Sequence, residues 1–85
     1  MTKDINRSVQ DLRDDYFCLD KNLQNKINNF IKQLPSQQIT TVQLQQMLQQ
    51  HLNKEISQNS IKYAMLLNNF IPEDMHKTEW KFIIN

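Results

Sequence analysis

The sequence contains no glycine, a single cysteine (Cys18) and only two prolines among its 85 residues. Without glycine, tight turns have to use Asn, Asp, Ser or Pro, and a glycine-rich phosphate-binding loop is impossible. One cysteine excludes an internal disulfide framework and suits a reducing compartment, so we expect a cytoplasmic protein. Because Cys18 lies between two large apolar residues, we expect it to be buried or half-buried and unreactive.

Strong net charge and long apolar runs are also lacking. The formal net charge is +1, which argues against a highly basic nucleic-acid coat but leaves room for a locally basic patch. No apolar run approaches the roughly 20 residues that a membrane span needs, and the first ten residues lack the apolar core of a signal peptide. We therefore expect no membrane partner, and one domain (residues 1–85) with a small core.

The N-terminal part, residues 4–34, carries two apolar stripes at helical spacing. The first predicts an amphipathic helix over residues 4–17, and the second predicts a helix over residues 21–34 that ends before Pro35. The stripes are nearly in phase, so one bent helix over residues 4–34 is an alternative. We favour a break near Cys18–Asp20, with Asp20 as the N-cap of the second helix. The first stripe consists of Ile5, Val9, Leu12 and Tyr16, and the second of Leu23, Ile27, Phe30, Ile31 and Leu34.

Two helix starts are encoded within residues 38–69. Thr40 followed by Gln43 forms the Thr-x-x-Gln pattern of a capping box, after a very short strand at Gln38–Ile39. Ser57 is the expected N-cap of the next helix, and apolar residues flank both caps in the positions of hydrophobic staples. Helices over residues 41–52 and 58–69, joined by a turn at residues 53–56, predict a helix-turn-helix.

Helical periodicity divides each helix of this pair into an inner and an outer face. The first helix is expected to bury Leu44, Met47, Leu48 and Leu52. The inner face of the second helix holds Ile61, Ala64, Met65 and Asn68. Its outward arc holds Asn59, Lys62, Tyr63 and Leu66, with Ser60 and Leu67 on the flank.

The C-terminal part, residues 70–84, is rich in residues that favour strands. Residues 70–72 form an expected edge strand, because Pro72 cannot donate a ladder hydrogen bond. Residues 78–84 alternate so that Trp80, Phe82 and Ile84 share one face. The two segments predict a β-hairpin that packs onto the core through Trp80 and Phe82.

From residue 21 to residue 84 this order of elements resembles a winged helix-turn-helix domain. The fold expected is mainly α with a small C-terminal β-hairpin, and the helix over residues 4–17 is an addition that covers a core face or forms a dimer contact. Domains of this order are similar to small DNA-binding regulators and to terminal modules of replication proteins of mobile elements. The resemblance implies a non-enzymatic DNA-binding or accessory protein, with the second helix of the pair as the recognition helix.

Carried over by position, the resemblance implies a set of DNA contacts in the recognition helix, the preceding turn and the wing. Three of the lysines, Lys54, Lys62 and Lys77, are expected to converge on one surface. The complete set is Lys54, Asn59, Ser60, Lys62, Tyr63, His76 and Lys77.

A protein partner is the alternative. The recognition helix carries one cation, and no arginine follows Arg13. An apolar face formed by Tyr63, Leu66 and Leu67 suits a protein interface or a homodimer equally well. The two function classes, DNA binding and protein binding, therefore both stay open at the level of the sequence.

Enzymatic, metal and cofactor chemistry have little support in the sequence. Asp11, Asp14 and Asp15 form an acidic cluster, but no His or Cys lies among them, so we expect a solvated helix face. His51 has no partner at metal-ligand spacing and lies near a helix C-terminus, where a protonated ring is favourable. We expect no catalytic residues, no metal and no cofactor.

Overall fold

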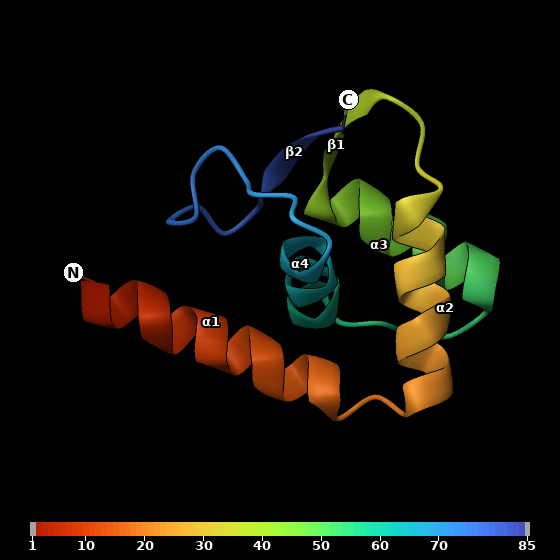
Figure 1. Cartoon of the computed structure of the whole chain (residues 1–85), viewed down its shortest axis with the longest axis horizontal. Coiled ribbons are helices and arrows are strands. Elements are labelled where there is room, and N and C mark those ends of the chain that lie inside the picture. The colour runs from red at the N-terminus through yellow and green to blue at the C-terminus, as the bar shows by residue number, and fades with distance from the viewer. Residues whose placement is uncertain (1, 85) are drawn as a thin grey trace.

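The computed structural model describes the backbone of residues 2–84 and the side chains of residues 9–84. Within that range the protein is mainly helical, with a small two-stranded antiparallel sheet. The helices are α1 (Thr2–Phe17), α2 (Lys21–Lys32), α3 (Thr41–Leu52) and α4 (Gln58–Leu67), and the strands are β1 (Gln37–Thr40) and β2 (Lys81–Ile84). Figure 1 shows α4 in the centre, with α1 below it, α2 to the right and α3 above.

The break between the first two helices is confirmed. α1 ends at Phe17, and the Asp20 carboxylate accepts a hydrogen bond from the Leu23 N–H at 2.8 Å, as an N-cap does. The Gln24 side chain donates to the Leu19 carbonyl at 2.8 Å and so fixes the linker to α2. The chain therefore changes direction here, and α1 and α2 pack on different sides of α4.

The helix-turn-helix caps are confirmed as well. The Thr40 hydroxyl accepts from the Gln43 N–H at 3.3 Å, and the Gln43 side chain accepts from the Thr40 N–H at 3.0 Å, which completes the capping box. The Ser57 hydroxyl accepts from the Ser60 N–H at 3.2 Å and caps α4. α4 ends at Leu67, two residues earlier than expected, with Asn68 as its C-cap.

Asparagine takes the place of glycine at two turns. Asn53, the C-cap of α3, has φ 54°, and Asn69, just after α4, has φ 68°. Asn tolerates this left-handed region better than most residues other than glycine, which explains how a glycine-free chain makes both turns.

The predicted C-terminal hairpin is wrong. Residues 70–72 form no strand, and β2 pairs instead with β1, with Gln37 opposite Ile84 and Thr40 opposite Lys81. The winged-helix arrangement expected from the sequence is therefore not confirmed. Thr41 fixes this pairing: its N–H donates to the Trp80 carbonyl at 2.9 Å, and its hydroxyl accepts from the Trp80 N–H at 3.1 Å.

One apolar core joins all four helices and both strands, and the expected burial of Trp80, Phe82 and Ile84 is confirmed. Two linked side-chain hydrogen bonds lie at the edge of this core. The Asn28 amide donates to the Tyr16 hydroxyl at 2.7 Å, and the Asn68 amide donates to the Asn28 side-chain oxygen at 2.8 Å. These bonds connect α1, α2 and α4 and fix how the three helices pack.

Candidate functional site

The face of α4 that the sequence assigned to DNA is largely covered by α1. The apolar stripe of α1 packs against α4, where Leu12 is 5% exposed and Tyr16 is 3% exposed. Ser60 and Lys62 are only 1% and 8% exposed, so their predicted outward position is wrong. Periodicity within α4 did not indicate this, because the covering residues belong to a distant segment of the chain.

The side chain of Lys62 is buried and makes contacts inside the protein. Its Nζ donates to the Thr78 carbonyl at 2.6 Å and lies 4.9 Å from the centre of the Trp80 ring, at cation–π distance. Burial lowers the pKa of Lys62 from its ordinary value of 10.5. Lys62 therefore joins α4 to the segment that leads into β2, with a desolvation cost to its charge.

Asn59 and Tyr63, two other members of the predicted arc, contact α1. The Asn59 amide donates to the Asp15 carboxylate at 2.8 Å, and the Tyr63 ring lies 5.3 Å from the Tyr16 ring and 5.8 Å from the Phe17 ring. The apolar face predicted around Tyr63 is only partly open: Tyr63 and Leu66 are half-buried, and Leu67 is 49% exposed.

The predicted convergence of three lysines is not found. Lys54 lines a small hollow beside α2, together with Asp20, Asn22, Leu23, Lys26 and Leu52. His76 and Lys77 are exposed in the loop after α4 and line a different recess, which also contains Asp11 and Lys62. The lysines at positions 54 and 77 thus lie in separate surface features.

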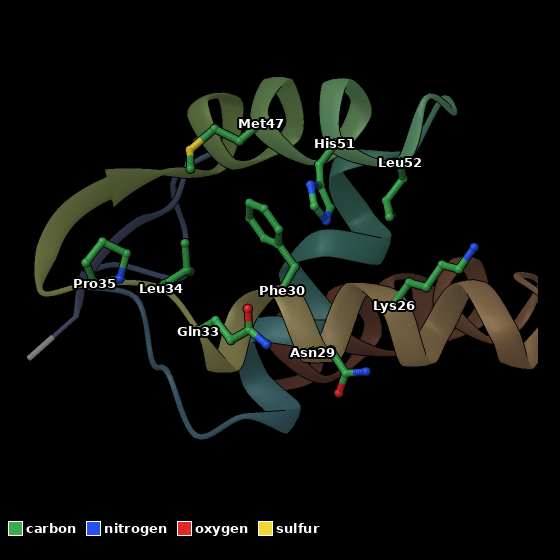
Figure 2. A pocket seen from close by; sticks show the side chains of 9 residues that line it. All are labelled: Lys26, Asn29, Phe30, Gln33, Leu34, Pro35, Met47, His51 and Leu52. Carbon is green, nitrogen blue, oxygen red and sulfur yellow. The ribbon is translucent and has the colours of Figure 1, made fainter.

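An open groove with an apolar lining lies between α2 and α3. It has a volume of about 660 Å³. In Figure 2, Phe30 from α2 and His51 from α3 point toward each other across the groove, and their ring centres are 5.1 Å apart. The residues that line it are Lys26, Asn29, Phe30, Gln33, Leu34, Pro35, Met47, His51 and Leu52.

The groove explains why Met47 is exposed. Met47 was expected in the buried stripe of α3, but it is 37% exposed and lies at the Leu34–Pro35 end of the groove. Of the other residues expected on the inner face of α3, Leu44 and Leu48 are fully buried and Leu52 is half-buried. α2 and α3 leave space between them at this point, so an inner position of the helix becomes a wall of the groove.

The segment that builds the groove carries charge of one sign. Residues 21–54 contain four lysines and no Asp or Glu, so all nine carboxylate side chains lie outside the segment that builds the groove. Lys26 and Leu52 also line the adjoining hollow that contains Lys54, so the two depressions are continuous. This acid-free segment is visible in the sequence, and it is the signal that would have indicated the groove side before the structure.

Metal ligands and reactive side chains were the remaining candidates among the described residues. No group of three His, Cys, Asp or Glu side chains that is suited to hold a metal ion occurs among them. Cys18 is exposed, contrary to the expectation of burial, and Asp11, Asp14 and Asp15 are exposed as expected. None of the helices within residues 2–84 is long and apolar enough to cross a membrane.

Comparison with known proteins gave no match to a family model, a curated protein or a solved structure.

Proposed function

We propose that this protein is a non-enzymatic protein-binding module that holds a segment of its partner in the groove between α2 and α3. The observation that carries the proposal is the groove itself, an open concave surface with an apolar lining from Phe30, Leu34, Met47 and Leu52. Apolar grooves between two helices suit an amphipathic helix laid along them, with side chains inserted at intervals of three or four residues.

The dimensions support a helical ligand. Along α2 the groove is lined from Lys26 to the C-cap Gln33, a rise of about 10 Å at 1.5 Å per residue, which is the length of about two turns of a bound helix. The long walls bear polar side chains at the rim, including Asn29 and Gln33, and apolar side chains inside. This distribution is typical of an interface with an apolar centre and a polar rim.

Selection from a displayed library of helical peptides of about 12 residues tests the proposal, because a helix of that length, about 18 Å, spans the groove and extends beyond its ends. Binding to the 85-residue chain is then measured by fluorescence polarisation. Met47→Lys places a charge in the groove and is expected to abolish binding, whereas Gln46→Lys, the same change one residue earlier on the exposed side of α3, leaves it intact. Selected peptides that bind both variants equally would contradict the proposal.

DNA binding is a second candidate, supported by the order of elements. A helix, a short strand, a helix pair and a C-terminal strand follow one another from α2 to β2, and we infer a reduced winged helix-turn-helix in which one strand replaces the expected wing hairpin. Binding through α4 requires that α1 move away, because Tyr16, Phe17 and Asp15 contact that helix.

Lys77 is the appropriate residue for testing DNA binding. A Lys62→Glu change would disturb folding, since it places a carboxylate against the Thr78 carbonyl and the Trp80 ring. Lys77 is exposed, so Lys77→Glu reports on binding, with Lys32→Glu as a control of equal charge on α2. Duplex binding that falls between about 50 and 200 mM salt and is weakened only by Lys77→Glu would support this candidate. Absence of such binding would exclude it.

A further inference from the structure

The groove side of the molecule carries a charge pattern that defines its partner more narrowly. We propose that the segment bound between α2 and α3 is an acidic amphipathic helix, with carboxylates placed beside its apolar residues. This inference rests on the proposed protein-binding function and specifies the chemistry of the partner.

The first step is charge complementarity. Lys26 stands at the rim of the groove, and Lys54 lies in the hollow that continues from it. The nearest acidic residues in sequence are Asp20 and Glu55, which flank the acid-free segment. Asp20 lines the far hollow, where its carboxylate is held by the Leu23 N–H as the cap of α2. The groove itself is lined by Lys26 and by no carboxylate, so a ligand carboxylate near Lys26 meets attraction without an opposing charge.

The second step separates an acidic peptide from a nucleic acid, the other common polyanion. Phe30, Leu34 and Met47 give the groove an apolar interior, which a phosphate backbone cannot occupy without losing hydration. An amphipathic helix satisfies both features, because its apolar residues enter the groove while its carboxylates reach the lysines at the rim.

The third step is the position of His51. This residue lies in the last turn of α3, its ring is exposed, and it faces Phe30 inside the groove. Its neighbours in the groove are neutral apart from Lys26. A carboxylate of the ligand placed here accepts a hydrogen bond from a ring N–H of His51, without competition from a carboxylate of this chain.

The test uses peptides selected against the 85-residue chain, as above, and examines their composition and the charge dependence of their binding. The expected result is enrichment of Asp and Glu over the starting library. Lys26→Glu is expected to weaken binding by roughly 5-fold, which is typical of a rim charge, whereas the matched change Lys32→Glu on the same helix has little effect. A selected peptide whose carboxylates are changed to Lys should lose binding to the wild-type protein and regain it with Lys26→Glu.

The outcomes distinguish this inference from the proposed function. Peptides that require Met47 but show no acidic enrichment and no response to Lys26→Glu would overturn the acidic partner and leave the groove as a binding site. Failure to select any peptide sensitive to Met47→Lys would overturn both. Duplex DNA that competes with the peptides and is itself weakened by Lys26→Glu would identify a nucleic acid as the occupant and overturn the inference.

Discussion

Replacement of Thr41 by valine tests how the C-terminal strand is held on the helices. The Thr41 hydroxyl accepts a hydrogen bond from the Trp80 N–H at 3.1 Å and lies 3.1 Å from the Trp80 carbonyl, and both residues are buried. Valine keeps the shape of the side chain but leaves the Trp80 N–H buried without an acceptor. The Trp80 carbonyl keeps its bond from the Thr41 N–H at 2.9 Å, so one group alone loses its partner.

The expected loss of stability follows from this single unpaired N–H group. A buried N–H left without a partner costs about 1–3 kcal/mol, so we expect Thr41→Val to lower the free energy of unfolding by about 2 kcal/mol. For a domain of this size, that corresponds to a fall in Tm of about 8–16 °C. Thr41→Ser keeps the hydroxyl and removes one methyl group, so it should cost about 1 kcal/mol.

Urea unfolding followed by the fluorescence of Trp80, the only tryptophan, measures the stability of each variant. Amide hydrogen exchange of Trp80 adds a local measurement, because its N–H should remain protected in Thr41→Ser and lose protection in Thr41→Val. Thr78→Val, at an exposed position, serves as a control and should change stability by less than about 0.5 kcal/mol. Equal stability of Thr41→Val and the wild type would refute this account of the β2 anchor.

Three further substitutions test other parts of the structure. Burial lowers the pKa of Lys62, so between that lowered pKa and 10.5 the unfolded chain binds more protons than the native protein. The free energy of unfolding should therefore rise with pH in this window. Urea unfolding across alkaline pH measures the rise, which should be absent from Lys62→Met. Asn53→Ala should destabilise the protein by about 1 kcal/mol, because alanine is strained at φ 54°, whereas Asn53→Gly should match or exceed the wild type in thermal unfolding; equal destabilisation by both would contradict the left-handed assignment. Tyr16→Phe removes the hydroxyl that accepts from Asn28 and should cost about 1 kcal/mol, whereas the exposed Phe17→Tyr change should be neutral; equal losses would exclude a role for this hydrogen bond.

The sequence predicted the helix caps better than the strand pairing or the groove. Local signals were dependable: Asp20, Thr40 and Ser57 all cap the helices that they were expected to cap. The predicted strands were less accurate, because pairing partners are distant in sequence and nothing in residues 70–84 indicates that β2 lies beside β1. The groove between α2 and α3 was missed, although the absence of carboxylates from residues 21–54 was available as a signal.

The sequence by itself determined the helices and where α2, α3 and α4 begin, whereas α1 begins at Thr2, two residues before its predicted start. Capping hydrogen bonds and helical periodicity act over three to eleven residues, so the side chains that decide them are neighbours along the chain. The absence of glycine was equally informative, because in a chain without glycine both left-handed turns are formed by asparagine.

Only the tertiary structure decided which faces of those helices remain open. α1 covers much of the face of α4 that the sequence assigned to DNA, Lys62 packs against Thr78 and Trp80, and the space between α2 and α3 exposes Met47. Each of these outcomes depends on where a second element packs, and the apolar stripe of one helix does not specify which partner will cover it. Because of this packing, the candidate binding surface is the groove between α2 and α3 and not the outer face of α4.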